Sequence, residues 1–282
     1  MTKSASYLVE GPDGRKIPVD IHVPEVGNDR VPVIIFLHGF KGFKDWGHFP
    51  LVCEFLARSG FAAARFNFSW NGTSPEKPDE FCELEQFGRN TFSRELDDLD
   101  MVIENLWWTI SMQKRIDPAR LGLLGHSRGG GTALLQAARD PRIKAVATWG
   151  GLCDFERRIN TPELAEWKSK GVTEIINTRT GQVLPLYIDL YNDFYEKKSL
   201  LDIQAATKKI QIPQLIVHGT ADDAVPLSEA EALKIWNPFA EFAEIHGGDH
   251  TFGGKHPWTE KNLPEDTLKA LAATTTFFRA NL

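Results

Sequence analysis

A serine between glycines is the first residue whose setting points to chemistry. The segment Gly125–Gly129 reads GHSRG, follows the apolar stretch Leu121–Leu124, and opens into the helix-forming stretch Thr132–Leu135. A serine on a tight turn from strand to helix exposes its Oγ, and the glycines two residues away on each side are needed because side chains there would clash with the backbone. The start of the helix also favours the negative charge that develops during acyl transfer. This context predicts that Ser127 is a nucleophile.

The acid and the base that such a serine requires follow it in the sequence. Asp222 and Asp223 come just after the apolar stretch Gln214–Val217, and His250 lies in a glycine-rich loop after Glu241–Ile245. A general base must reach the serine hydroxyl, so it belongs in a loop at the rim of the sheet, where His250 is expected. The order serine, acid, histidine is one that hydrolases with this type of turn use. Spacing alone leaves Asp222 and Asp223 as alternatives for the acid.

The negative charge on the reacting oxygen needs two backbone donors. The N–H of Arg128, directly after the nucleophile, is expected to supply one. The loop after the apolar stretch Val31–Leu37 is placed to supply the other, from the N–H of Phe40. We expect the remaining histidines of these loops to be structural or superficial: His126, His218, His246 and His256.

Short apolar stretches alternate with helix-like stretches along most of the chain. The Asp13-Gly14 turn joins two predicted strands, Ser6–Val9 and Lys16–Val23, as a hairpin. Further strands are expected at Val31–Leu37, Ala62–Phe68, Leu121–Leu124, Lys144–Thr148, Gln214–Val217 and Glu241–Ile245, and helices at Phe49–Ser59, Thr91–Ser111, after Ser127, at Ser228–Trp236 and at Glu265–Arg279. This alternation predicts an α/β fold with a mostly parallel sheet covered by helices on both faces, whose ligands bind beyond the carboxyl ends of the strands.

Residues 152–207 interrupt the alternation because they contain no stretch typical of a buried strand. A structureless loop of this length is improbable in a compact domain, so we expect a cap subdomain inserted into a core of residues 1–151 and 208–282. Tyr187, Tyr191 and Tyr195 recur at every fourth position, which would place them on one helical face. Two interpretations stay open: the tyrosines pack the cap onto the core, or they bind substrate in an aromatic or acyl pocket.

Composition excludes several classes of protein. The 282 residues are 42% hydrophobic and 25% charged, with a net charge of −6 and no basic stripe, so we expect neither a nucleic-acid partner nor a membrane span. The sequence begins without the apolar stretch of a secretory signal, which favours the cytoplasm. Cys53, Cys82 and Cys153 are odd in number and widely spaced, so we expect neither disulfides nor a zinc site.

These motifs together resemble the α/β-hydrolase superfamily. The resemblance rests on HGF at 38–40, GHSRG at 125–129, HGTAD at 218–222 with Val225-Pro226, and GDH at 248–250. Within the superfamily the chain looks most like bacterial dienelactone-hydrolase-like and serine-aminopeptidase-like esterases, including cinnamoyl and feruloyl esterases. The resemblance implies an eight-stranded sheet, and it favours Asp222 over Asp223 because relatives carry the acid in an HGxxDxxVP stretch. The chain departs from many relatives at Arg128, where they carry Met or Gln.

The expected activity is cleavage of a carboxylic ester of a small molecule through an acyl-enzyme, with no metal and no organic cofactor. A serine aminopeptidase, or a thioesterase or acyltransferase, is the enzymatic alternative. An aminopeptidase would need a cap carboxylate to hold the substrate amine, for which Glu163, Glu166 and Glu174 are weak candidates. A non-catalytic receptor is disfavoured by the intact set of Ser127, Asp222 and His250. The oligomeric state stays open, with a homodimer as one alternative.

Overall fold

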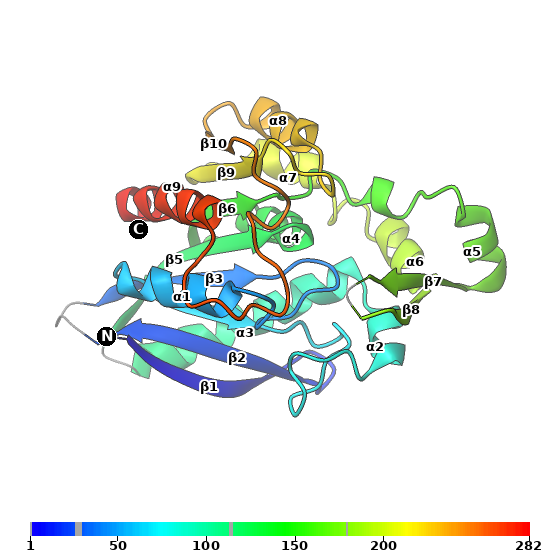
Figure 1. The fold of residues 1–282 in the computed structure, drawn as a ribbon, viewed down its shortest axis with the longest axis horizontal. Helices are drawn as coiled ribbons and strands as arrows, with labels where there is room; N and C mark the ends of the chain where they lie inside the picture. Colours follow the sequence, from blue (N-terminus) through cyan, green and yellow to red (C-terminus); the bar gives the residue numbers. More distant parts are fainter. Residues whose placement is uncertain (1, 26–29, 113–114, 179) are drawn as a thin grey trace.

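A single large sheet forms the centre of the molecule (Figure 1). The computed structural model describes residues 2–25, 30–112, 115–178 and 180–282. Within them, eight strands pair in the order β1-β2-β4-β3-β5-β6-β9-β10. Their bounds are β1 Thr2–Glu10, β2 Lys16–Pro24, β3 Val31–Leu37, β4 Ala62–Phe66, β5 Ile116–His126, β6 Ile143–Trp149, β9 Gln214–Gly219 and β10 Glu241–Ile245. From β4 to β10 all neighbouring strands are parallel, which confirms the predicted sheet. Strand β2 is antiparallel to both of its neighbours, β1 and β4.

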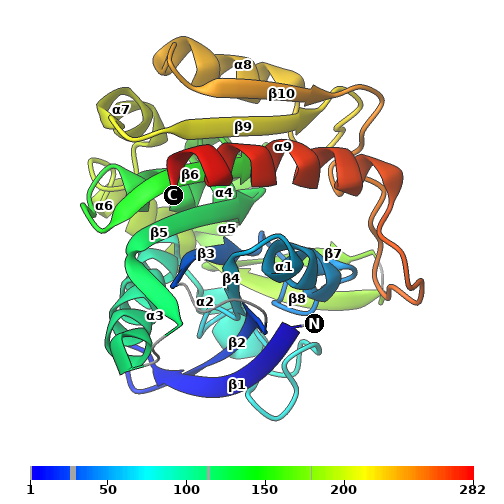
Figure 2. The same cartoon turned by 90° about the vertical axis from the view of Figure 1, so that its left-hand side faces the viewer.

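Alternate residues of the central strands face two separate hydrophobic clusters, as expected for a sheet buried on both faces. In β3, Ile35 belongs to one cluster and Phe36 to the other. Helices α1 and α9 cover one face, while α3, α4, α7 and α8 cover the opposite face (Figure 2). Their bounds are α1 Phe49–Arg58, α3 Phe92–Met112, α4 Arg128–Ala137, α7 Ile203–Lys209, α8 Leu227–Trp236 and α9 Glu265–Asn281.

The segment after β6 contains regular structure of its own, seen in green at the right of Figure 1. It comprises η1 Glu156–Arg158, α5 Leu164–Lys170, an antiparallel pair formed by β7 Val172–Asn177 and β8 Gln182–Tyr187, and α6 Asp189–Glu196. Its apolar residues, Phe155 and Phe194 among them, join the same cluster as α3 and α4. The segment from η1 to α6, called the insertion below, therefore has regular structure of its own and shares the hydrophobic core of the main body. Position 179 within it lies outside the described residues, and the division of the chain at 152 and 207 stays a prediction.

Two local expectations were wrong. The expected helices do not include the short helix α2 Leu84–Arg89, whose six residues are too few to show a helical period. In addition, Tyr187 is the last residue of β8, paired with Val172, and only Tyr191 and Tyr195 lie on α6. The three tyrosines therefore do not share one helical face.

No helix in the described part of the chain combines the length and hydrophobicity that crossing a bilayer requires.

Candidate active site

Ser127 occupies the turn between β5 and α4 in a strained backbone conformation, with φ of 56° and ψ of −122°. The turn is compact: a Cβ on Gly125 would lie 2.2 Å from the backbone oxygen of Gly129, and one on Gly39 would lie 2.7 Å from Cβ of Ser127. Only glycine fits at both positions. The Ser127 N–H donates to the backbone oxygen of Trp149 at 2.9 Å, which fixes the turn against the neighbouring strand. Strain of this kind is found at functional sites, where the surrounding structure maintains it.

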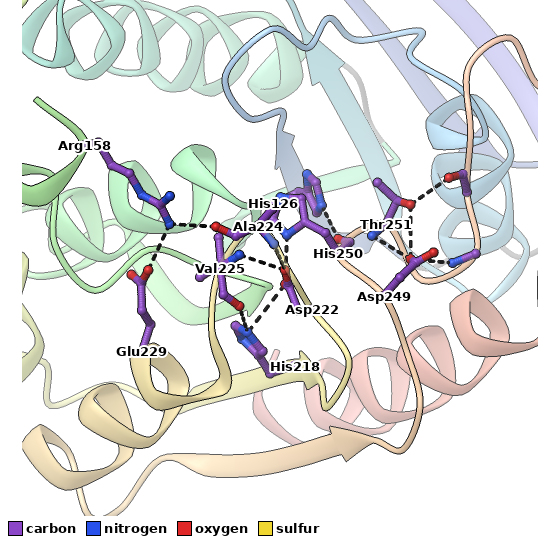
Figure 3. Close-up of polar contacts among 12 residues, drawn as sticks. His126, Arg158, His218, Asp222, Ala224, Val225, Glu229, Asp249, His250 and Thr251 are labelled. Carbon is purple, nitrogen blue, oxygen red and sulfur yellow. Dashed lines mark hydrogen bonds and ion pairs between the residues drawn. The ribbon is translucent and has the colours of Figure 1, made fainter. Parts of the chain in front are cut away.

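Asp222 and His250 lie together at the carboxyl ends of the strands, as Figure 3 shows. The His250 Nδ1–H donates to Oδ2 of Asp222 at 2.8 Å, while Oδ1 accepts the N–H groups of Ala224 and Val225 at 3.0 and 2.8 Å. Burial by itself raises the pKa of Asp222, but the hydrogen bond and charge interaction with His250 and the Val225 amide hold it below its ordinary value. The carboxylate therefore stays ionised and fixes the imidazole with Nε2 available. Asp223, in contrast, is exposed.

Ser127 and His250 line one pocket of about 300 Å³. In the described part of the chain, no hydrogen bond joins the Ser127 hydroxyl to the His250 imidazole. In hydrolases of this kind, that hydrogen bond often forms only when substrate binds. Neither the Phe40 N–H nor the Arg128 N–H donates to another described residue. Phe40 follows Gly39 in the loop that approaches the Ser127 side chain, and Arg128 directly follows Ser127. This arrangement brings a strained serine, an imidazole and two unused amide donors to one end of the sheet.

A second histidine supports the first. The His126 Nε2–H donates to the backbone oxygen of His250 at 2.9 Å, and the two rings lie 4.8 Å apart between centroids (Figure 3). Burial lowers the pKa of His126 to about 3, so the ring stays neutral and keeps this single donor. The loop carrying His250 is therefore attached to the turn carrying Ser127. His218 similarly donates to the backbone oxygen of Val225 at 2.8 Å and supports the Asp222 loop.

The walls of the pocket were not predicted from the sequence. Three aromatic residues, Phe40, Trp46 and Phe49, line it together with Asn177 from β7 and polar groups of the surrounding loops. The richness in aromatic residues of the stretch 40–49 was a usable signal, because this stretch directly follows the predicted oxyanion loop. Asn177 carries no comparable signal, since it reaches the pocket only through the fold of the insertion.

The structure does not support the predicted tyrosine subsite, because none of the three tyrosines lines the pocket that holds Ser127. The hydroxyl of Tyr187 donates to Glu85 at 2.6 Å, that of Tyr191 accepts from Lys168 at 2.7 Å, and that of Tyr195 donates to Glu156 at 2.8 Å. The first contact joins the insertion to α2, and the other two join elements within the insertion. By its hydrogen bond, Tyr187 fits the interpretation in which the tyrosines pack the cap onto the core, whereas those of Tyr191 and Tyr195 stabilise the insertion itself.

The sheet order, the turn at Ser127 and the two-faced covering of helices define an α/β-hydrolase fold. Comparison with known proteins gives the family: residues 13–266 match the profile of the family described as "Putative esterase", and the chain belongs to this esterase family. It is 27% identical over 223 residues to 2,6-dihydropseudooxynicotine hydrolase of Paenarthrobacter nicotinovorans, a match that spans 78% of this chain and 52% of that protein.

Solved structures of esterases and dienelactone hydrolases share the fold. Est1E from Butyrivibrio proteoclasticus superposes with a TM-score of 0.71 at 19% identity, covering 98% of both chains. A dienelactone hydrolase from Anabaena variabilis superposes with a TM-score of 0.65 at 16% identity, covering 100% of this chain and 99% of the other. The resemblance stated from the sequence motifs is therefore confirmed, and the chain is a hydrolase of the esterase family.

Proposed function

We propose that this protein is a serine hydrolase that cleaves a small carboxylic ester through an acyl-enzyme. The observation that carries the proposal is the 2.8 Å hydrogen bond between Asp222 and His250, and His250 lines a pocket together with Ser127. A buried carboxylate that fixes an imidazole beside a strained serine is the arrangement that activates a serine hydroxyl.

In the proposed reaction, the Ser127 Oγ attacks the ester carbonyl carbon while its proton moves to Nε2 of His250. The Phe40 and Arg128 amides bind the resulting oxyanion. When the tetrahedral intermediate collapses, the carbon–oxygen bond to the alcohol breaks and His250 returns the proton to the departing alkoxide. A water molecule then repeats these steps on the acyl-enzyme, releasing the acid and restoring Ser127. No step requires a metal or an organic cofactor.

The pocket supports a substrate with an aromatic acyl or alcohol group. Phe40, Trp46 and Phe49 offer ring faces and edges to such a group, and Asn177 adds a polar contact. Aryl esters, including hydroxycinnamoyl esters, therefore fit better than esters that carry a charged amine. Est1E, one of the structural neighbours, has also been solved with ferulic acid bound.

The aminopeptidase alternative receives less support. Among the described residues that line the pocket, none is an aspartate or a glutamate, so a free substrate amine finds no carboxylate there. Glu163 and Glu174 are exposed, and Glu166 accepts from Lys170 on its own helix at 2.5 Å. We also retain the cytoplasm as the proposed compartment, in agreement with the free thiols of Cys53, Cys82 and Cys153.

A substrate panel tests the proposal directly. Purified protein is assayed with p-nitrophenyl alkyl esters, aryl and hydroxycinnamoyl esters, and aminoacyl anilides, each alongside the Ser127→Ala variant. We expect turnover of esters, faster for aromatic ones, and its loss in Ser127→Ala. Faster cleavage of the anilides would favour the peptidase, and ester turnover that survives in Ser127→Ala would refute the assignment of the nucleophile.

A further inference from the structure

The side chain of Arg128 lies buried beneath the loop that carries Phe40. Its Nη1 donates to Oε1 of Glu95 at 3.2 Å, and both side chains are less than 8% exposed. Glu95, on the first turn of α3, also accepts from Nδ2 of Asn90 at 2.9 Å. This buried ion pair therefore joins α4, which follows the nucleophile, to the beginning of α3.

A buried ion pair needs a reason other than stability. Removing two charges from water costs about as much as their attraction returns, so such pairs are weak evidence for stabilisation. Burial raises the pKa of Glu95 even though Arg128 and Asn90 oppose the shift, which indicates how strongly the site is desolvated. What the pair touches suggests its role.

The guanidinium of Arg128 lies over the ring of Phe40, 4.1 Å from its centroid. Phe40 also stacks on Phe87 of α2, with centroids 5.6 Å apart and planes 29° apart. The next residue, Lys41, has φ of 56°, a conformation that a residue with a side chain rarely adopts. The ring of Phe40 is thus held by two neighbours at the point where the loop backbone is strained.

The space beside the Arg128 guanidinium is too small to admit a substrate. The cavity between the loop, Glu95 and Arg128 measures about 10 Å³, which is no more than the room a single water occupies. In this conformation, therefore, Arg128 does not bind a substrate carboxylate. Its side chain acts on the reaction through its contact with Phe40.

We propose that Arg128 and Glu95 are positioning residues: their buried ion pair holds the ring of Phe40, and thereby keeps the Phe40 N–H aimed at the oxyanion. This inference rests on the proposed function and assigns to the Arg128 side chain a task separate from that of its own amide. Loss of an oxyanion donor costs about 10²- to 10³-fold in kcat, so loosening one should cost about tenfold.

The test removes both charges together, because a single replacement would leave a lone buried charge. Three variants are compared with wild type: Arg128→Met with Glu95→Gln, Phe40→Leu, which keeps its amide, and the combination of all three. Arg139→Met serves as the matched control, since Arg139, two residues after the end of α4, also pairs with α3, through a partly exposed ion pair with Asp100 at 2.5 Å. Each protein is measured for thermal unfolding, for kcat and KM with p-nitrophenyl acetate, and for inhibition by phenylboronic acid, which forms a tetrahedral adduct with the serine.

We expect the charge-pair variant to lose about tenfold in kcat and to bind the boronate about tenfold more weakly, with KM within about twofold. Phe40→Leu should lose kcat to a similar extent, and its KM should rise as well because the ring lines the pocket. In kcat, the combined variant should lose little more than either change alone, because both changes act through one loop. The control should keep both constants.

The inference is overturned if the charge-pair variant unfolds at lower temperature but keeps kcat and boronate affinity, or if its losses multiply with those of Phe40→Leu. Wild-type protein that neither hydrolyses esters nor binds boronate would instead refute the proposed function itself.

Discussion

Replacing Asp222 by asparagine should nearly abolish turnover without unfolding the protein. The side chain is held in one orientation, because Oδ1 accepts two backbone N–H groups, from Ala224 and Val225, at 3.0 and 2.8 Å. In Asp222→Asn the amide oxygen must occupy that position, so the NH₂ group points at Nδ1 of His250, where Oδ2 accepts at 2.8 Å in the wild type.

The consequence for the reaction follows from the tautomer of His250. An NH₂ group at this place requires Nδ1 to accept a hydrogen bond, so the imidazole proton moves to Nε2. That nitrogen is then unable to take the proton of Ser127. The corresponding change in a known serine, histidine and aspartate triad lowers kcat by about 10⁴, equivalent to about 5 kcal/mol in the activation barrier.

The assay is steady-state hydrolysis of p-nitrophenyl acetate, with urea unfolding to verify that the variant folds. Asp223→Asn is the matched control, because Asp223 is its exposed neighbour in the same loop and should retain activity within about twofold. If Asp222→Asn retained more than about a tenth of wild-type kcat, or if Asp223→Asn lost as much as Asp222→Asn, the reasoning would be refuted.

Three further predictions concern supporting groups. His126→Phe removes the donor to the His250 backbone and should lower kcat about fivefold in steady-state assays, with an unchanged kcat counting against the tether. Burial raises the pKa of Asp98 to about 7, so the folded state keeps a proton that the unfolded chain releases above about pH 4, and stability falls as pH rises through this window. Urea unfolding at pH 5 and pH 8 should therefore show a smaller difference for Asp98→Asn than for wild type, and an equal difference would contradict the assignment. Gly125→Ala places a Cβ 2.2 Å from the oxygen of Gly129 and should destabilise the fold by more than about 3 kcal/mol, whereas unchanged urea unfolding would mean that the turn adapts.

The features that the sequence predicted well are those encoded locally. The turn at Ser127 needs small neighbours on both sides and an apolar strand before it, and all of these are adjacent in the chain. The central strands were equally visible, because a strand buried on both faces is a continuous apolar stretch, as Val33 to Leu37 shows. The predicted strands and helices of the core therefore match the observed ones closely.

The insertion was harder to interpret because its elements are short and half-buried. In β7 and β8 the paired Ile176 and Val183 are exposed while the next pair, Ile175 and Leu184, faces the body, so no continuous apolar stretch marks either strand. The spacing of the tyrosines suggested one helix, but Tyr187 belongs to the preceding strand. Period alone does not separate a helix from a strand followed by a helix.

Roles that depend on long-range contacts were also beyond reach of the sequence. The buried contact of Arg128 with Glu95 joins residues 33 positions apart, and Asn177 lines the pocket only because the insertion folds over it. The sequence marked Arg128 as a departure from relatives but gave no partner for its side chain. Its neighbours had to be seen in three dimensions.

The central claim is that Ser127 forms a covalent acyl-enzyme with the help of His250. It is tested most directly by mass spectrometry of protein quenched in acid during turnover of p-nitrophenyl acetate, followed by peptide mapping. We predict one added acetyl group on the peptide that contains Ser127, absent in Ser127→Ala and strongly reduced in His250→Ala. An acetyl group found on another residue, or ester turnover without any acylated protein, would contradict the account.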